Sequence, residues 1–552
     1  MPSVSAHVAR TLSTHLTHVY GVMGNGNAYF LDALLTGTDA VYTPVRHEAG
    51  AVFAADAHFR AGGGIAAATT TYGAGFTNTM TALAEAVQAR VPLVLVVGDE
   101  PTSGPRPWDV DQIGMAAAVG ARTYTVGLHD AAATTSIAVE HALRFNVPTV
   151  LAIPYDVARL DAGEVPATAP LRPVAPVVPA GEFAEATLDD IALTLSGAER
   201  PFLLAGRGAW LADAGRALGE LADLTHAVTA SSALGRGLFP RAEFDLGVAG
   251  GFGAPAAMEL VRSADVAVVF GAGLNQFTMR FGRLFSPGTR VIQVDTAATA
   301  THAHVGTFLR GDAGLVAGEL VRRVRALREA PAGPGWRESL DFAALTEREV
   351  PAELAQDGRL DPRAVADAIA PLLPRERVVV SDGGHFLGWA NMYWPVASPE
   401  RMLMVGTAYQ TIGTGFASMP GAADARPEST VVLTSGDGGG LMALPDLETA
   451  VRHCRGRGLA VIWNDAAYGA EVNLYGVLGL ERSPMLIEQV DFAALTEAFG
   501  GRGVVVRSLA EFEALREWSG LSPQERPFLT LDLRISGAVI APHQHEVIEQ
   551  NR

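Results

Sequence analysis

Short apolar runs alternate with longer helix-like stretches along the whole chain, and this alternation constrains the fold more than any other feature. The runs include VPLVLVVGD, PFLLAG, DVAVVFGAG, TVVLTSGDGG and LAVIWND, and each of them ends at Gly or Asp. Apolar runs of four to eight residues with such boundaries are typical of buried strands in parallel sheets. Repeated strand–helix–strand alternation therefore predicts an α/β fold.

Two stretches rich in Pro, Ala and Gly divide the chain into three segments. They are AGEVPATAPLRPVAPVVPAGE at residues 162–182 and REAPAGPGW at residues 328–336. Such a composition suits extended linkers between domains. We therefore expect three doubly wound parallel-sheet domains, spanning residues 1–165, 183–328 and 337–552. Ligands of such domains bind at the carboxyl ends of the strands.

The charge and composition exclude several classes of protein. A net charge of −18 argues against binding to nucleic acid or to an anionic membrane surface. The apolar runs are too short to span a bilayer, and the N-terminus has no basic region followed by an apolar one. One cysteine, Cys454, excludes an intrachain disulfide, and the absence of lysine excludes Schiff-base chemistry on a lysine side chain. We expect a cytoplasmic protein.

Polar side chains follow two strand-like runs near the C-terminus. Asp437 lies among glycines in SGDGGG, and Asn464 and Asp465 follow the next run. Hard cations such as Mg²⁺ prefer oxygen ligands, and the cation is often also bound to phosphate groups of a ligand. Glycine-rich turns before a helix leave backbone N–H groups free to bind phosphate. The two strand ends together predict a site for a metal ion and a phosphate group.

The segment GDGGGLMALPDLETAVRHCRGRGLAVIWNDAAYG resembles the thiamine-diphosphate motif of the superfamily that contains acetolactate synthase, pyruvate decarboxylase and benzoylformate decarboxylase. The resemblance implies that Asp437 binds Mg²⁺, which bridges to the cofactor diphosphate. The family spacing, counted strictly, makes Asn464 the second ligand, whereas matching WND to the strand end of relatives favours Asp465. The residue two further on lends its backbone carbonyl, which is Ala467 in the preferred register and Ala466 in the other.

A second motif, VYTPVRHEAGAVFAADAHFRAGG at residues 41–63, resembles the family signature that carries the catalytic glutamate. The resemblance makes Glu48 the carboxyl group that hydrogen-bonds to the aminopyrimidine ring and promotes deprotonation of the thiazolium carbon. Further segments resemble the family at residues 69–86, 381–394 and 408–422, where Ile412 would prop the cofactor in its bent shape. Together these segments imply a cofactor-binding set made of Glu48, Gly73, Asn78, Gly384, His385, Gln410, Ile412, Gly436, Asp437, Gly438, Gly439 and Tyr468.

Departures from the family pattern narrow the chemistry. Asn25 stands where pyruvate decarboxylases carry an aspartate, and SGPRPWDVDQ lacks their histidine pair. Gln112 without a proton-delivering pair resembles the carboligases and lyases, although Asp111 replaces the phenylalanine usual in acetolactate synthases. Glu471 falls where pyruvate decarboxylases have a site glutamate. The predicted catalytic residues are therefore Glu48, Gln112, Asn25 and Glu471.

The function that the resemblance implies is a thiamine-diphosphate-dependent carbon–carbon lyase or carboligase. It would decarboxylate a 2-oxo acid such as pyruvate and transfer the acyl-anion equivalent to a carbonyl acceptor. Alternatives are a 2-oxo acid decarboxylase of the benzoylformate, phenylpyruvate or indolepyruvate type, an acyloin or 2-hydroxyacyl-CoA lyase, and a cyclic dione hydrolase. Two further alternatives are a non-catalytic cofactor-binding protein and a nicotinamide enzyme, but GDGGGL lacks the G-x-G-x-x-G pattern of the latter. No motif indicates FAD.

The resemblance also implies an oligomer. In this family the catalytic glutamate and the metal-binding aspartate of one site come from different subunits, so we expect a homodimer or homotetramer with active sites at the subunit interface. A small-molecule 2-oxo acid or acyloin is the expected substrate. The C-terminal APHQHEVI, with His543 and His545, is expected to be a disordered or surface tail rather than a lid over the site.

Overall fold

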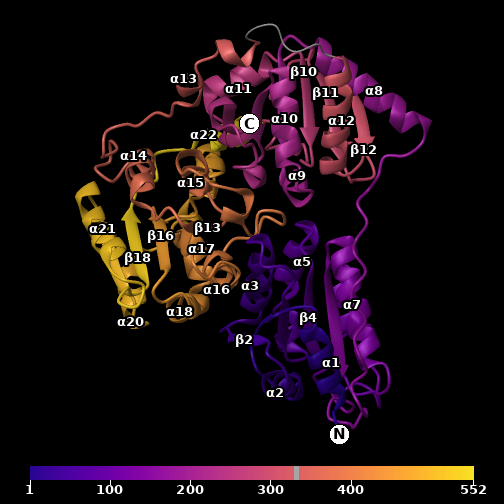
Figure 1. The fold of residues 1–552 in the computed structure, drawn as a ribbon. Helices are drawn as coiled ribbons and strands as arrows, with labels where there is room; N and C mark the ends of the chain where they lie inside the picture. Colours follow the sequence, from indigo (N-terminus) through magenta and orange to yellow (C-terminus); the bar gives the residue numbers. More distant parts are fainter. Residues whose placement is uncertain (328–334, 552) are drawn as a thin grey trace.

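Three parallel β-sheets form the framework of the protein (Figure 1). The computed structural model describes residues 1–327 and 335–551. Each sheet has six strands, every described strand pair is parallel, and helices connect successive strands. The predicted α/β class with three doubly wound sheets is confirmed. Among these residues no helix is both long enough and apolar enough to cross a membrane.

The first sheet has the strand order β2-β1-β3-β4-β6-β5. Its two longest strands, β4 and β6, are buried along their entire length, which explains their continuous apolar sequences. The strands are β1 (His18–Gly21), β2 (Val41–Pro44), β3 (Ala67–Thr70), β4 (Leu93–Asp99), β5 (Arg122–Thr125) and β6 (Pro148–Pro154). The helices are α1 (Val4–Ser13), α2 (Ala28–Gly37), α3 (Glu48–Arg60), α4 (Ala74–Thr77), α5 (Met80–Gln88), α6 (Gln112–Ala118) and α7 (Ala131–Phe145).

The second, central sheet has the order β12-β11-β10-β7-β8-β9, so the chain reverses direction across the sheet between β7 and β10. Ligands of open α/β sheets bind outside the carboxyl ends of the strands at such a point. The strands are β7 (Pro201–Ala205), β8 (Val228–Ser231), β9 (Asp245–Val248), β10 (Val266–Phe270), β11 (Arg290–Asp295) and β12 (Thr307–Arg310). The helices are α8 (Glu182–Gly197), α9 (Arg207–Leu211), α10 (Gly215–Thr225), η3 (Gly250–Phe252), α11 (Pro255–Arg262) and α12 (Ala313–Leu327).

The third sheet repeats the order of the first, as β14-β13-β15-β16-β18-β17. Its strands are β13 (Arg377–Ser381), β14 (Met402–Met404), β15 (Thr430–Gly436), β16 (Gly458–Asn464), β17 (Arg502–Val506) and β18 (Leu529–Arg534). Its helices are α14 (Pro362–Ile369), α15 (Leu387–Tyr393), α16 (Gly415–Ala425), α17 (Asp437–Met442), α18 (Leu444–His453), α19 (Gly469–Leu474), α20 (Phe492–Ala498), α21 (Glu513–Gly520) and α22 (Pro542–Gln550).

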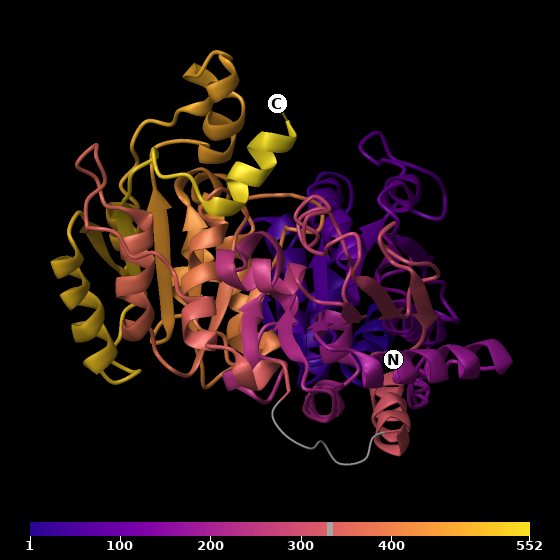
Figure 2. The ribbon, with the colours of Figure 1, turned by 90° about the horizontal axis from the view of Figure 1, so that it is seen from above.

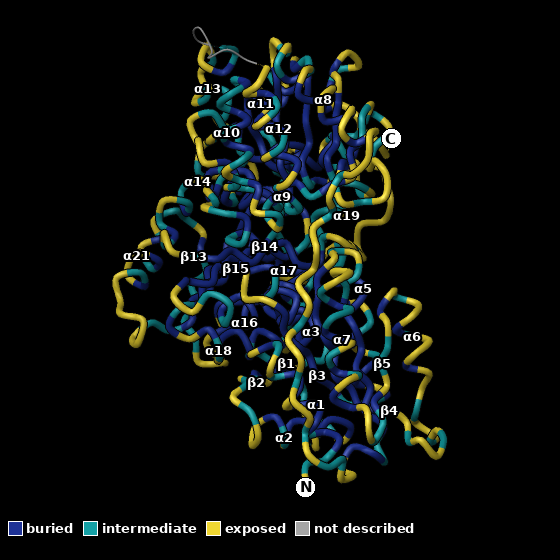
Figure 3. Tube along the Cα trace, turned by 45° about the vertical axis from the view of Figure 1, so that its right-hand side comes forward, coloured by how far each residue is buried: buried dark blue, intermediate teal, exposed yellow. Residues whose placement is uncertain are grey.

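The first and third domains share one hydrophobic core and lie side by side beneath the central domain (Figures 1 and 2). Helix α3 packs directly on α16, and a side chain at Gly421 would collide with the backbone of Ala54. Figure 3 shows the strands of the sheets buried and many of the connecting loops exposed. The loops that carry candidate functional residues lie at the carboxyl edges of these buried strands.

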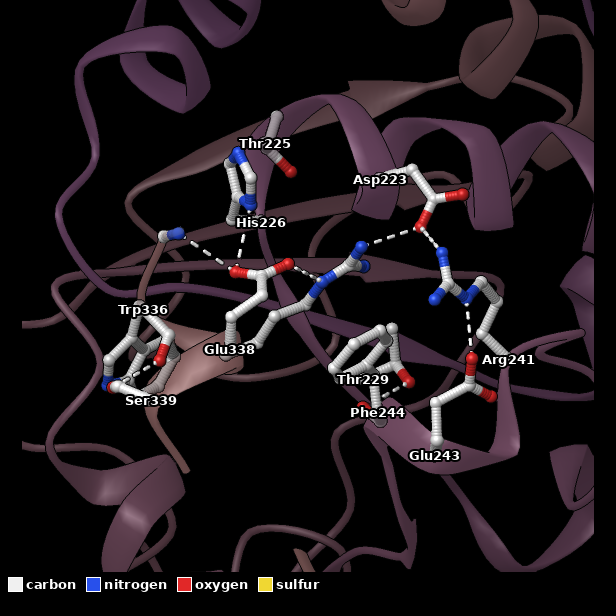
Figure 4. Close-up of polar contacts among 12 residues, drawn as sticks. Asp223, Thr225, His226, Thr229, Arg241, Glu243, Phe244, Trp336, Glu338 and Ser339 are labelled. Atoms are coloured by element: carbon white, nitrogen blue, oxygen red, sulfur yellow. Dashed lines mark hydrogen bonds and ion pairs between the residues drawn. The ribbon is translucent and has the colours of Figure 1, made fainter. Parts of the chain in front are cut away.

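The two predicted linkers differ in structure. Residues 165–180 contain no helix or strand, whereas most of the segment at 328–336 lies outside the described residues. Arg337 is buried against the central domain and pairs with Asp223 at 2.7 Å and with Glu338 at 2.9 Å. Glu338 also accepts a hydrogen bond from His226 (Figure 4). The predicted start of the third domain at residue 337 therefore lies in a segment that still packs on the central domain.

Candidate active site

A cavity of about 650 Å³ lies where the carboxyl ends of the third sheet approach those of the central sheet. The third domain contributes the loops after β13, β14, β15 and β16, and the central domain contributes the loops after β7, β8, β9 and β10. The first domain contributes Arg60, Gln88 and Ala89. Twelve of the residues predicted for the site line this cavity: Gly384, His385, Gln410, Ile412, Gly436, Asp437, Gly438, Gly439, Asp465, Ala467, Tyr468 and Glu471.

Two carboxylates form the polar centre of the cavity. Asp437 begins α17 directly after β15, and Asp465 directly follows the neighbouring strand β16. Burial raises the pKa of both carboxyl groups, and the charge of Asp465 raises the pKa of Asp437 further. The Oδ2 atom of Asp437 is buried without a hydrogen-bond partner. Two close carboxylates with an unpartnered oxygen are a suitable site for a cation with oxygen ligands.

Asn464 lies on the opposite side of β16 from this cavity. Its side-chain amide donates hydrogen bonds to Asp532 Oδ1 at 2.9 Å and to the carbonyl of Val490 at 3.0 Å. Successive side chains of a strand point to opposite faces, so Asn464 and Asp465 cannot both face the cavity. The carbonyl of Ala466 accepts a hydrogen bond from Ile487, whereas Ala467 lines the cavity. The geometry favours the register of Asp465 and Ala467.

Glycines keep the backbone beside Asp437 open. A side chain at Gly438 would lie 2.7 Å from the ring of Tyr468, and one at Gly439 would lie 2.9 Å from Asp382. Gly384, after β13, has φ +140°, a conformation that other residues rarely adopt. These positions form a cradle that exposes backbone to the cavity, which is what close approach of a phosphate group requires.

Asp382 organises the loops around the cavity, and sequence reasoning did not single it out. Its Oδ1 atom accepts hydrogen bonds from the backbone N–H groups of Gly383 at 2.8 Å, Gly413 at 3.0 Å and Thr414 at 3.1 Å. Its Oδ2 atom accepts one from the hydroxyl of Ser435 at 2.9 Å. One carboxylate thus joins the loop after β13 and strand β15 to the loop of Ile412. The available signal was its position, at the end of a strand and before two glycines.

The C-terminal segment covers part of the cavity, so the expectation of a disordered or surface tail is wrong for His543. His543 is buried, lines the cavity and contacts the rings of Phe252 and Phe277, whereas His545 is exposed. The backbone N–H of Ala541 donates to Nε2 of His385 at 2.9 Å. Burial lowers the pKa of His385 to about 4, which leaves the ring neutral at pH 7. Sequence reasoning missed this arrangement because its partners lie in the central domain.

The remaining predicted residues form a second group on the first domain. Asn78 donates a hydrogen bond to Glu48 at 3.0 Å, and the backbone N–H of Gly73 donates to Gln112 Oε1 at 2.8 Å. Asn25 donates to the hydroxyl of Tyr72 at 2.9 Å. Among the described residues that line the cavity, none belongs to this group. One chain therefore holds two separate halves of the predicted site.

The contacts of Gln112 are those of a buried structural group. Besides accepting from Gly73, its side-chain amide donates to the carbonyl of Gly98 at 3.0 Å and to Asp99 Oδ1 at 3.1 Å. Both ends of the amide are therefore occupied within the chain. In this arrangement Gln112 holds the Gly73 turn, where the backbone has φ +60°.

Comparison with known proteins identifies the family. Models of the thiamine pyrophosphate enzymes match residues 2–119 (N-terminal TPP binding domain), 188–320 (central domain) and 382–527 (C-terminal TPP binding domain). The acetolactate synthase large subunit IlvG of Mycobacterium tuberculosis is 30% identical over 501 residues, covering 86% of this chain and 85% of that protein. The sulfoacetaldehyde acetyltransferase of Alcaligenes xylosoxydans xylosoxydans is 26% identical, covering 92% and 88%.

A solved structure shares the fold. The thiamine diphosphate-dependent 4-hydroxybenzoylformate decarboxylase of Rhodococcus jostii RHA1 superposes with a TM-score of 0.77 over 97% of this chain and 99% of that one, at 20% identity. The three sheets, the carboxylate pair at adjacent strand ends and the three matching domains agree with one another. The chain belongs to the thiamine pyrophosphate enzymes.

Proposed function

We propose that the protein is a carboligase or lyase that decarboxylates a 2-oxo acid such as pyruvate and transfers the acyl-anion equivalent to a carbonyl acceptor. The observation that carries this proposal is that two neutral side chains of the first-domain group, Asn25 and Gln112, are already hydrogen-bonded within the chain. Asn25 is bonded to Tyr72, and Gln112 is bonded at both ends of its amide. In the same loop Arg106 forms a two-pronged pair with Asp109. Asn25 and Gln112 are not acids, so the predicted residues of this group include no acid other than Glu48, which accepts a hydrogen bond from Asn78. The lack of a second acid to protonate a product early favours transfer to a second carbonyl.

The residues on the cavity fit thiamine diphosphate with Mg²⁺. Asp437, Asp465 and the carbonyl of Ala467 would hold the cation, which satisfies the unpartnered Oδ2 of Asp437. The diphosphate would lie against the cradle of Gly384, His385, Gly436, Gly438 and Gly439, beside Tyr468, with Ile412 and Gln410 at the cofactor rings. When bound, thiamine diphosphate supplies a nucleophilic carbon and an electron sink for the electrons released with CO₂.

The chain contributes proton handling and orientation. Asn78 holds the carboxyl of Glu48 through a hydrogen bond of 3.0 Å, and this carboxyl would hold or give up a proton beside the aminopyrimidine ring of a bound cofactor. Gln112 positions the Gly73 turn beside Glu48. Glu471 is an exposed acid that lines the cavity. Its presence favours a second candidate function, a 2-oxo acid decarboxylase in which Glu471 delivers the proton to a released aldehyde.

A second copy of the chain would complete the site. Exposed apolar side chains lie near the first-domain group and near the cavity loops in the sequence, and exposed apolar surface of this kind supports a contact with a second chain. They are Met23, Trp108, Val110 and Ile113 in the first domain, and Tyr409, Met442, Tyr475 and Val477 in the third. We infer a homodimer or homotetramer in which Glu48 of one chain faces Asp437 of another. A cytoplasmic location and the absence of nucleic-acid or membrane partners remain part of this proposal.

The test is a substrate panel with purified protein, thiamine diphosphate and Mg²⁺. The donors are pyruvate, 2-oxobutyrate, benzoylformate, phenylpyruvate and benzoin, each with and without an acceptor aldehyde or 2-oxo acid, and products are followed by mass spectrometry. A coupled 2-hydroxy ketone supports the proposal and identifies the donor. Free aldehyde as the sole product from every donor would replace it with the decarboxylase alternative, and Glu471→Gln should then abolish aldehyde release.

A further inference from the structure

The C-terminal segment after β18 returns to the cavity and bridges two domains. Ile535, His543 and Gln544 line the cavity. Helix α22 packs on η3 of the central domain and on α19 of the third domain, and Figure 1 shows it beside the central domain. The segment therefore contacts both walls of the cavity.

Two ion pairs attach α22 to one loop of the central domain. Arg280 pairs with Glu546, with Nε 2.7 Å from the carboxylate, and Arg283 pairs with Glu549 at 3.0 Å. Arg280 and the next residue, Phe281, have φ values of +50° and +55°. Two successive non-glycine residues in this region are strained, and surrounding contacts must hold them there. The same loop contributes Phe277 and Thr278 to the cavity.

The segment also determines the tautomer of His385, a side chain that lines the cavity. His543 packs against Phe252, with ring centroids 5.2 Å apart, and against His385 at 6.5 Å. Because the backbone N–H of Ala541 donates to Nε2 of His385, the neutral ring must carry its proton on Nδ1. Nδ1 faces Gly469, where an added side chain would lie 3.4 Å away. His385 is thus a hydrogen-bond donor of fixed orientation at the edge of the cavity.

We propose that the C-terminal segment is a positioning element of the cofactor site: Ala541 fixes His385 as a single N–H donor for the diphosphate group, and the ion pairs of Arg280 and Arg283 hold the segment in place. Retention of the diphosphate then depends on the contact between α22 and the central domain. This inference rests on the proposed assignment of the cavity to thiamine diphosphate. Loss of the ion pairs between α22 and the central domain would let the segment move. Nε2 of His385 would then lose its donor, and the ring would no longer prefer one tautomer.

The experiment measures binding of thiamine diphosphate with Mg²⁺, and of thiamine alone, by calorimetry on the full-length protein. Arg280→Ala should raise the Kd of thiamine diphosphate about tenfold, equivalent to about 1.4 kcal/mol, and leave that of thiamine within about twofold. Arg241→Ala is the matched control, because Arg241 forms an exposed ion pair with Glu243 on the central domain (Figure 4). The control should change neither Kd.

A double-variant cycle tests whether the effect passes through His385. In a His385→Gln background Arg280→Ala should add less than about twofold to the Kd, because the donor that it disturbs is already gone. The proposal would be overturned if Arg280→Ala left the Kd of thiamine diphosphate unchanged. It would also be overturned if the fold-changes of Arg280→Ala and His385→Gln multiplied in full in the double variant. A wild-type protein that binds no thiamine diphosphate would instead refute the assignment of the cavity. Thermal unfolding of the apo variants separates either result from general loss of stability.

Discussion

Replacing Asp382 by alanine tests whether one buried carboxylate holds the cavity loops together. The substitution leaves three backbone N–H groups, of Gly383, Gly413 and Thr414, without their acceptor. An orphaned buried donor costs about 1–3 kcal/mol, and the bond of Thr414 is buried whereas those of Gly383 and Gly413 are part-buried. The free energy of unfolding should therefore fall by roughly 3–5 kcal/mol. The hydroxyl of Ser435 can redirect to the carbonyl of Gly436, with which it already has a contact of 3.2 Å, and adds little.

Two matched variants distinguish the loss of the acceptor atom from the loss of its charge and from the loss of one donor. Asp382→Asn retains Oδ1 for the three N–H groups and loses only the extra strength of hydrogen bonds to an ionised acceptor, which predicts a loss of about 1–2 kcal/mol. Ser435→Ala removes one donor to Oδ2, which predicts a loss of about 1 kcal/mol. The expected order of stability is wild type, then Ser435→Ala and Asp382→Asn together, then Asp382→Ala far below.

The assay combines urea unfolding of the apo proteins with hydrogen exchange read by mass spectrometry. Peptides covering residues 411–416 should exchange faster in Asp382→Ala, because the amides of Gly413 and Thr414 lose their acceptor. Peptides from β4, which contacts none of these groups, serve as the internal reference. If Asp382→Ala lies within about 1 kcal/mol of Ser435→Ala, the three N–H bonds contribute far less than this reasoning requires. If Asp382→Ala fails to fold whereas Asp382→Asn folds, that result also supports the role of the three N–H bonds.

Three further predictions concern other residues. Glu48→Gln should lower turnover by about a hundredfold or more while changing the Kd of thiamine diphosphate less than about threefold, and near-normal turnover in steady-state kinetics would contradict its role. Asp465→Ala should weaken Mg²⁺ binding, measured by calorimetry, more than about tenfold. Asn464→Ala should instead lower the free energy of unfolding by about 1–3 kcal/mol. The reverse pattern would make Asn464 the metal ligand. Burial lowers the pKa of His58 to about 4. The unfolded chain binds this proton first, near pH 6.5, so stability falls as pH drops from about 6.5 to 4, by up to about 3 kcal/mol; an equal loss in His58→Gln would exclude His58 as the cause.

The fold and the location of the cavity could be predicted because both depend on local patterns. Buried parallel strands leave continuous apolar runs, and TVVLTSGD and LAVIWND end at the same edge of one sheet because their strands are neighbours. The glycines after Asp437 mark the close approach that the cradle needs. These signals lie within about thirty residues of chain, so no tertiary contact is required to interpret them.

The choice between Asn464 and Asp465 could not be made from the sequence. A shift of one residue turns a strand side chain to the other face, and the sequence does not specify where β16 ends. In the structure the orientation of Asn464 is set by distant partners, because Asp532 and the carbonyl of Val490 accept hydrogen bonds from its side-chain amide. The role of Asp382 could not be predicted for the same reason, since its donors come from the loop after β13, the loop of Ile412 and Ser435 in β15. The burial of His543 depends on Phe252 and Phe277, more than 260 residues earlier.

The separation of the two half-sites follows from a repeat in the topology. The first and third sheets have the same strand order, and Gly73 follows the third strand of one as Asp437 follows the third strand of the other. Helices α3 and α16 follow the second strand of their sheets, and they pack against each other within the chain. The contact between α3 and α16 thus joins the two domains through helices that cover their sheets. In this arrangement the group around Glu48 lies away from the cavity of its own chain. In the proposed dimer, a twofold arrangement of two chains would join each first-domain group to the other chain's cavity and would generate two identical sites at once. On this argument, dilution to monomers should abolish turnover while each chain still retains both halves of the site.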